Sequence, residues 1–365
     1  IKKYLLRAFR FSFLSVCESA CNMKYRDRKW EISCRPAGTV IFFVFCLRGM
    51  LDFFQIQIII MEFNTLNGRR FMISYAVSLG SFGGLMTPAL ADAFRKSKLH
   101  NLELSFTPYT VESVQAEASR ELTRSLLKEK TVRSSSVHLP FYGGGVSWDP
   151  SAPDETARRE VAARFIRLIR SHADMMAPHV TLHASNEPPL AEHPVRIDQA
   201  CRTIEDLLPL AAELGFSINV EYLPRTCIGN CVEELQTIMS RFDPELVGIC
   251  MDVNHIMDRW RELPEIIAVL APRIRTFHIN DYDGVDEMHW FPGQGILDWQ
   301  AVMRQIRAIS HDVLLIFETL NELGTKVSHV ADPLFGIRQT EFSIWFLENC
   351  ESVVPQVRDF RIPGN

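Results

Sequence analysis

Four acidic or imidazole side chains in the second half of the 365-residue sequence directly follow short apolar runs. They are Glu221 in INVEYLPR, Asp252 in ICMDVNH, His278 in FHIND and Glu318 in LIFETL. Such runs are expected to be buried, and a buried carboxylate without a cation or hydrogen-bond donors costs several kcal/mol. A shared cation removes that cost, and carboxylate and imidazole ligands suit Mn²⁺, Mg²⁺ or Co²⁺ better than a thiolate-binding ion. We therefore predict one divalent metal ion held by these four residues.

Three further histidines occupy comparable positions. His138 (VHLP) and His183 (TLHAS) follow earlier apolar runs, and His255 lies three residues after Asp252. A single histidine at the end of a strand is more often a hydrogen-bonded structural residue than a ligand. Asp, Glu or His at six successive run ends is harder to attribute to chance, so we expect these side chains to lie near the metal site. Asp281, close behind His278, is a candidate for orienting a ligand.

The elements that must position these residues follow a regular alternation from Met72 onward. Short runs rich in β-branched or aromatic residues predict strands, and longer segments with an apolar period of about 3.6 residues predict helices. The predicted strands are 72–79, 102–106, 135–139, 180–183, 217–221, 247–252, 274–279 and 313–318. The predicted helices include 157–173, 197–214, 231–242, 263–270, 299–309 and 333–349. Gly215 is placed to end a helix, and Asp198 and Asp298 are placed to begin one.

Eight strand and helix repeats over about 290 residues match the size of a (β/α)₈ barrel, whose chemistry lies at the C-terminal ends of the strands. An open doubly wound sheet is the alternative. The segment GSFGG after the first predicted strand lacks the G-x-G-x-x-G spacing that binds dinucleotides in such sheets. We therefore predict an α/β protein with a (β/α)₈ TIM barrel.

Residues 1–70 are a different kind of sequence. Residues 1–71 hold 12 Lys and Arg against 5 Asp and Glu. The most membrane-like run, residues 38–61, carries Arg48 and Asp52 in its middle, where each charge would cost roughly 2.5–3.5 kcal/mol in a bilayer. We expect no membrane span but a poorly structured N-terminal extension over 1–70, non-native or disordered, then the barrel over 71–350 and a tail over 351–365.

The remainder of the chain is acidic, with 27 Lys and Arg against 39 Asp and Glu. This balance disfavours nucleic acid as a partner, because phosphate-backbone binding depends on basic residues. Nine cysteines without a C-x-x-C pair indicate reduced thiols, so we expect a cytoplasmic protein. Barrels often pair, so a homo-oligomer is compatible with the sequence.

The sequence resembles the xylose-isomerase-like TIM barrel superfamily, in particular its sugar phosphate isomerase/epimerase family. The resemblance rests on the motifs VEYLPR, MDVNH, FHIND, HWFPGQG followed by Leu297-Asp298-Trp299, and FETL. The resemblance covers about 71–349. It implies metal ligation by Glu221, Asp252, His278 and Glu318, with Glu221 and Glu318 also acting as acid and base through an enediolate. The implied substrate is a small sugar or sugar phosphate. Its implied contacts are His138, His183, Arg225, His255, His289 and Trp290.

Two alternatives stay open. The same superfamily contains apurinic endonucleases with three zinc ions, and their ligand types are echoed by His138, His183, Glu221, Asp252, His255, His278, His289 and Glu318. The acidic barrel and the LPR sequence after Glu221 favour the isomerase. The other alternative is a binding barrel without turnover, which fold alone does not exclude.

Overall fold

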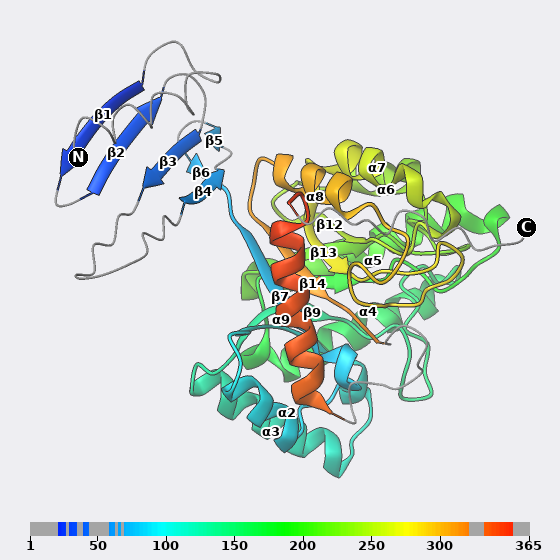
Figure 1. Ribbon diagram of the computed structural model, residues 1–365. Coiled ribbons are helices and arrows are strands. Elements are labelled where there is room, and N and C mark those ends of the chain that lie inside the picture. Colours follow the sequence, from blue (N-terminus) through cyan, green and yellow to red (C-terminus); the bar gives the residue numbers. More distant parts are fainter. Residues whose placement is uncertain are drawn as a thin grey trace, which may run out of the picture. The chain divides into compact units, whose positions relative to one another are not determined.

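The computed structural model describes residues 71–320 and 332–352, together with the backbone of residues 69–70 and of β1 (Cys21–Arg26), β2 (Lys29–Cys34), β3 (Thr39–Phe43), β4 (Ile58–Glu62) and β5 (Thr65–Leu66). The chain divides into two compact units, Ile1–Met72 and Ile73–Asn365 (Figure 1). In the first unit β1 to β4 form an antiparallel sheet in sequence order, and β5 pairs with β6 (Arg69–Arg70). The sequence patterns predicted no strand there. Much of the 38–61 run and most of the expected tail lie outside the described residues.

The second unit is built on a closed barrel of parallel strands, as predicted. Its strands are β7 (Ile73–Ser78), β8 (Asn101–Ser105), β9 (Arg133–His138), β10 (His179–Leu182), β11 (Ser217–Glu221), β12 (Val247–Asp252), β13 (Ile274–Ile279) and β14 (Val313–Phe317). The barrel closes because β14 pairs with β7, with Ile316 opposite Ala76. Each of these strands overlaps the strand that the sequence predicted at that place.

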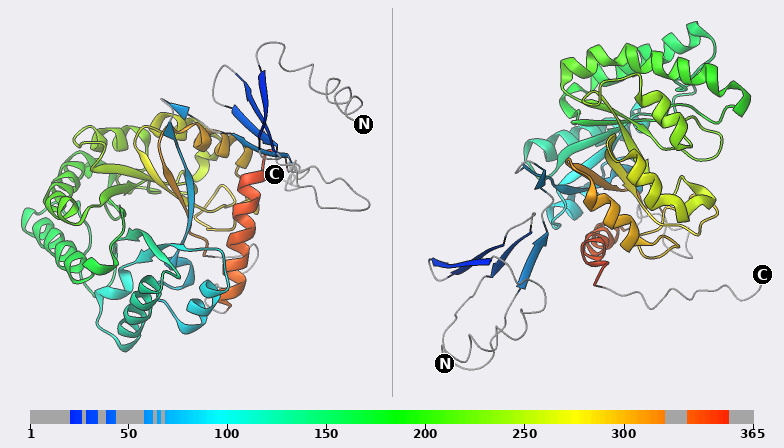
Figure 2. Two further views of the ribbon diagram at one scale, coloured as in Figure 1. Left: turned by 90° about the vertical axis from the view of Figure 1, so that its left-hand side faces the viewer. Right: turned by 90° about the horizontal axis from the view of Figure 1, so that it is seen from above.

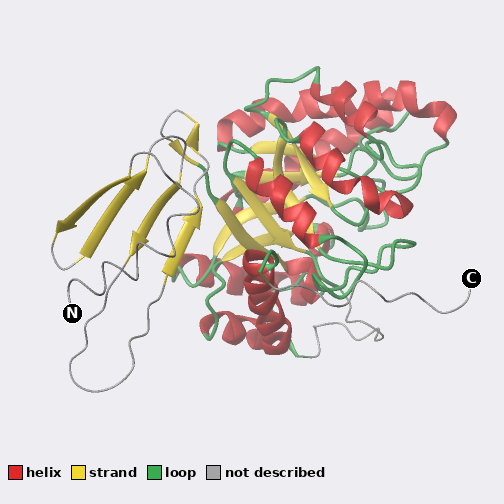
Figure 3. Cartoon of the chain, turned by 45° about the horizontal axis from the view of Figure 1, so that its top comes forward, coloured by secondary structure: helices red, strands yellow, loops and turns green. Residues whose placement is uncertain are grey.

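Helices surround the strands (Figures 2 and 3). They are α2 (Pro88–Arg95), α3 (Val114–Lys128), α4 (Glu155–Ser171), α5 (His193–Leu214), α6 (Val232–Met239), α7 (Leu263–Leu270), α8 (Trp299–Ala308) and α9 (Pro333–Asn349). Short 3₁₀ helices lie in the connections between the strands and these helices: η1 (Leu79–Phe82), η2 (Thr107–Thr110), η3 (Ala173–Met175), η4 (Leu190–Glu192) and η5 (Met257–Glu262). No helix in the described part of the chain combines the length and the apolar character that a membrane crossing requires.

Local sequence signals explain most helix ends. Gly215 ends α5 in the left-handed conformation with φ +74°, which glycine adopts without strain. Asp298 begins α8, where its carboxylate accepts a hydrogen bond from the Ala301 amide at 3.2 Å. The prediction that Asp198 begins a helix was wrong. A proline in the first turn starts α5 earlier, at His193, and Asp198 forms ion pairs with arginines from within the helix.

The two faces of the barrel wall differ in chemistry. Outward-facing side chains pack with the helices into one large hydrophobic core. Along each strand, inward-facing side chains alternate with these outward-facing ones. One layer below the C-terminal ends of the strands, the inward-facing side chains include five buried polar residues. This set is Glu103, Ser136, Thr181, Asn219 and Thr276, each fully buried. A small separate apolar cluster of Ala76, Leu314 and Ile316 shares that face. The barrel interior is therefore polar on most of its circumference.

Candidate metal centre

The four predicted metal ligands converge at the C-terminal ends of neighbouring strands. Glu221 ends β11, Asp252 ends β12, His278 lies in β13, and Glu318 directly follows β14. One ligand atom from each lies within 4.8 Å of every other. The Nδ1 atom of His278 is 3.1 Å from Glu221 Oε1, 3.1 Å from Glu318 Oε2 and 3.6 Å from Asp252 Oδ2. Parallel strands bring these atoms together because the register sets Asp252 opposite His278.

Glu221, His255 and His138 have shifted pKa values. Burial would raise the pKa of Glu221, but His278, His183 and His138 hold it well below its usual range. Burial lowers the pKa of His255, yet Asp252 and its other acidic neighbours raise it to about 10. His138 follows the same pattern, with a pKa of about 9 because Glu221 outweighs burial. His278 likewise holds the pKa of Glu318 below its usual range. Glu221 and Glu318 therefore favour the ionised form, and their charge favours a cationic partner.

Two further groups of donors overlap the first. His138 joins Glu221 and His278 in one of them, and Asp252, His255 and His289 form the other. His289 Nδ1 also lies 3.0 Å from the Glu318 carbonyl oxygen and 3.2 Å from Asn280 Nδ2. The predicted contact His138 is thus within ligand range of Glu221 and His278, and His255 and His289 are within ligand range of Asp252.

His183 approaches the centre from β10. Its Nε2 atom is 3.0 Å from Glu221 Oε2, the oxygen that also lies 3.2 Å from His138 Nε2. The His183 ring stacks on Phe141 with centroids 4.1 Å apart, and His138 meets the same ring edge-on at 5.8 Å. Burial lowers the pKa of His183, which favours a neutral imidazole. Phe141 therefore forms an aromatic wall that fixes both histidines.

Arg225 is not brought into the cluster. Its guanidinium is 43% exposed and forms ion pairs with Glu187 at 2.8 Å and with Glu287. Glu287 Oε2 in turn lies 3.6 Å from His255 Nε2. Arg225 thus connects the loop after β11 to the loops after β10 and β13, which carry Glu187 and Glu287. A direct contact between Arg225 and substrate stays a prediction.

The loop between β13 and α8 carries His289 and Trp290. Trp290 exchanges two backbone hydrogen bonds of 2.8 Å with Asp281. The buried Asp281 carboxylate accepts hydrogen bonds from Trp299 Nε1 at 2.8 Å and from the Gly293 amide at 2.9 Å. Burial raises the pKa of Asp281 to about 6. Asp281 therefore stabilises the loop that carries His289. Its carboxylate is hydrogen-bonded to backbone amides and to the Trp299 indole, and not to a predicted metal ligand.

A family model described as "Xylose isomerase-like TIM barrel" matches residues 96–335. The chain belongs to this family. An uncharacterised protein of Sinorhizobium fredii is 26% identical over 227 residues, which are 56% of this chain and 72% of the relative. An uncharacterised protein of Methanocaldococcus jannaschii is 24% identical over 191 residues, which are 51% of this chain and 64% of that protein.

Several solved structures share the fold at low sequence identity. A D-tagatose 3-epimerase-like protein superposes with a TM-score of 0.60 at 20% identity, covering 77% of this chain and 98% of that chain. D-psicose 3-epimerase from Clostridium cellulolyticum gives a TM-score of 0.59 at 13% identity over 75% and 98% of the two chains. The IolI protein with a bound zinc atom gives 0.56 at 14% identity over 76% and 99%.

The donor set fits a divalent cation. Three carboxylates and one imidazole converge, and all four residues are largely buried. Such a set satisfies the coordination of Mn²⁺, Mg²⁺, Co²⁺ or Zn²⁺, and without a cation it would crowd ionised oxygens in a low-dielectric site. The identity of the ion and the roles of the individual residues stay predictions.

The sequence patterns missed two residues close to the centre. Glu103 lies in β8 with one oxygen 3.3 Å from His278 Nε2, and Phe141 stacks on His183. Glu103 was overlooked because it lies within its strand, not at its end. Its signal was a charged residue in the apolar run NLELS, at a position that the alternation assigns to the barrel interior.

Proposed function

We propose that the protein is a divalent-metal-dependent sugar or sugar phosphate isomerase or epimerase, with Glu221 and Glu318 as its proton-transfer groups. The observation that carries the proposal is the placement of these two glutamates. They come from the ends of β11 and β14, and each has a carboxylate oxygen 3.1 Å from the same nitrogen of His278. Two carboxylates from different strands at one centre can supply the base and the acid for one substrate.

The proposed reaction needs a base and an acid beside a cation. One glutamate removes the proton from the carbon next to the substrate carbonyl, and the electrons of that C–H bond form the double bond of an enediolate. The other glutamate must enter the step protonated, and for epimerisation it donates that proton to the opposite face of the same carbon. For isomerisation the proton goes to the neighbouring carbon, and the hydroxyl proton moves to the former carbonyl oxygen. The metal ion, when bound by Glu221, Asp252, His278 and Glu318, supplies positive charge that stabilises the negative oxygen.

The names of structural relatives support a sugar as the substrate. They include the D-tagatose 3-epimerase-like protein, D-psicose 3-epimerase and an L-ribulose 3-epimerase. His138, His183, His255 and His289 surround the glutamates and offer imidazole donors to sugar oxygens. D-tagatose, D-psicose, D-fructose and L-ribulose are therefore the first substrates to test.

The decisive measurement is metal analysis of the purified full chain by mass spectrometry. We expect one Mn, Co or Mg ion per chain, and ketose turnover that is lost on chelation and restored by adding that ion back. A chain that binds no divalent ion under any of these conditions would refute the proposal.

A trinuclear zinc phosphodiesterase is the second candidate function. It is favoured by the three overlapping donor groups, which include His138, His255 and His289 beside the four central residues. Three zinc ions per chain, together with cleavage of a DNA duplex that contains an abasic site, would establish this candidate in place of the isomerase.

A further inference from the structure

Glu103 is a carboxylate sealed inside the barrel, below the candidate metal centre. It lies in the middle of β8 and is fully buried. Its Oε2 atom accepts a hydrogen bond from Ser136 Oγ at 2.8 Å and lies 3.3 Å from His278 Nε2. Among the described residues its Oε1 atom has no hydrogen-bond partner.

Stability does not explain this residue. A buried carboxylate loses its hydration, and an oxygen without a donor regains none of it. An apolar side chain of similar volume would cost less at this position. The inward face of the wall tolerates such groups, since Ala76, Leu314 and Ile316 occupy it elsewhere. The charge of Glu103 therefore has a use other than holding the barrel together.

The contacts of His278 indicate that use. Its two ring nitrogens face different carboxylates: Nδ1 faces Glu221 and Glu318, and Nε2 faces Glu103. With a cation bound at the centre, as the proposed function requires, Nδ1 would face the ion together with Glu221 and Glu318. The Glu103 carboxylate, which accepts hydrogen bonds, would then keep the ring proton on Nε2 and leave the Nδ1 lone pair for the ion. A carboxylate behind a metal-bound histidine also makes the imidazole a stronger ligand.

We propose that Glu103 is a positioning residue that fixes the ring orientation and tautomer of His278 for metal binding. The proposal rests on the proposed function, because it needs His278 to be a metal ligand. Ser136, which is paired with Glu103 in the β8–β9 register, holds the carboxylate in place through its hydroxyl. Glu103 touches neither the ion nor the substrate and acts only through His278.

The test compares Co²⁺ binding to the metal-free full chain and to the Glu103→Gln variant by titration calorimetry, together with the thermal unfolding of both metal-free proteins. Glu103→Gln keeps the shape and removes the charge. We expect it to bind Co²⁺ about 10–100-fold more weakly. We expect the metal-free variant to melt at the same temperature as the wild type or higher, because it no longer buries a carboxylate with one oxygen that lacks a hydrogen-bond donor.

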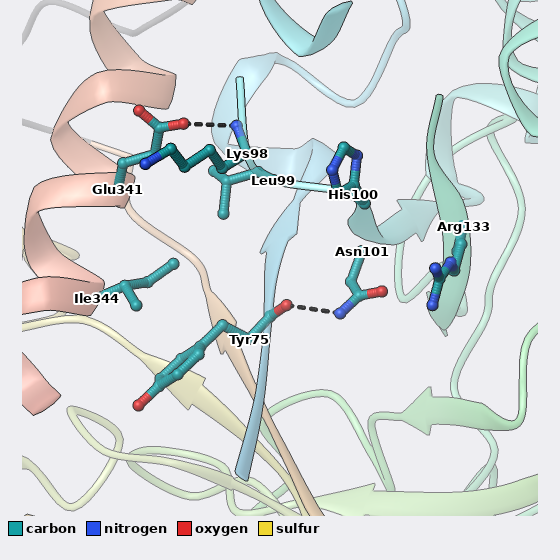
Figure 4. A pocket seen from close by; sticks show the side chains of 8 residues that line it. All are labelled: Tyr75, Lys98, Leu99, His100, Asn101, Arg133, Glu341 and Ile344. Carbon is teal, nitrogen blue, oxygen red and sulfur yellow. Dashed lines mark hydrogen bonds between the residues drawn. The ribbon is translucent and has the colours of Figure 1, made fainter. Parts of the chain in front are cut away.

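Glu341→Gln is the matched control. Glu341 lies at the opposite end of the barrel strands, in a pocket of about 370 Å³ with Tyr75, Asn101 and Arg133, where its carboxylate accepts a hydrogen bond from the Lys98 amide at 2.7 Å (Figure 4). This variant should bind Co²⁺ like the wild type.

The outcomes separate this inference from the proposed function. A wild type that fails to bind Co²⁺ would refute the metal site itself. A wild type that binds Co²⁺, with Glu103→Gln equal to it within a factor of two, would overturn only the role of Glu103. A variant that binds weakly and also melts earlier without metal would make Glu103 a structural residue and would overturn the proposal as well. If Glu103 is a structural residue, Ser136→Ala should also lower the melting temperature of the metal-free protein, because it removes the hydrogen bond to Glu103 and leaves the Glu103 carboxylate in place.

Discussion

Glu221 is surrounded by histidines. Its two oxygens lie within 3.5 Å of nitrogens of four histidines, His138, His183, His255 and His278. A carboxylate in such surroundings stays ionised, because each neighbouring imidazole that carries a proton favours its charge. Glu318 is more accessible, with 19% of its side chain exposed, and its carboxylate also lies against His278. The two glutamates thus share one neighbour and differ in their access to a ligand.

We expect Glu221→Gln and Glu318→Gln each to lower the rate of solvent-deuterium incorporation into a ketose substrate by about 10²–10⁴-fold. Each substitution removes a proton-transfer group and keeps the volume of the side chain. Incorporation is measured by mass spectrometry in D₂O with the Glu341→Gln variant as control. Exchange at the wild-type rate in both glutamine variants would end the proposal of two proton-transfer groups.

The loop between β13 and α8 is the element that delivers His289 to the centre. Asp281 stabilises this loop, because its carboxylate oxygens accept hydrogen bonds from the backbone amides of Tyr282 at 3.0 Å and Gly293 at 2.9 Å. Gly295 passes so close to Asp281 and Tyr282 that a Cβ atom there would approach backbone atoms nearer than 3.0 Å. The loop conformation therefore depends on the absence of a side chain at this position.

Gly295→Ala should lower the free energy of unfolding by about 1–3 kcal/mol, since the added methyl group forces the loop backbone away from Asp281. Urea unfolding followed by tryptophan fluorescence measures the change. Ile296→Ala is the control in the same loop, because Ile296 is 38% exposed and should lose little. Equal stability of Gly295→Ala and the wild type would mean that the loop rearranges without cost.

On the scale of the whole molecule, the barrel is complete within the second unit. Every strand that closes it lies between Ile73 and Phe317, and the first unit ends at Met72. The candidate centre draws all of its residues from the second unit. The barrel should therefore fold and bind metal without the preceding residues.

A chain that begins at Met72 is expected to keep the melting temperature of the barrel and to bind Co²⁺ with the affinity of the full chain. Thermal unfolding and titration calorimetry on both chains test this. Insolubility of the shortened chain, or loss of Co²⁺ binding, would show that the first unit is part of the working structure.

The periodicity of the sequence was sufficient to predict the eight strands, six of the helices and the four side chains that converge at the strand ends. These features are local, because alternation along a strand and an acidic or imidazole residue at its end are visible within a few positions. Arg225 shows the limit of such reasoning: its motif suggested substrate, and the fold surrounds it with Glu187 and Glu287. Whether it also meets substrate depends on how these loops pack.

Glu103 could not be assigned to the centre from the sequence, because it is separated from His278 by 175 positions. Only closure of the barrel, which sets the register between strands far apart in the chain, brings its carboxylate behind that imidazole. The sequence by itself determined the order of the elements and the donors at their ends, since both are written in short-range patterns. The tertiary structure alone decided which donors share a centre and which charges lie behind them, because those distances arise from strand pairing around the whole cylinder.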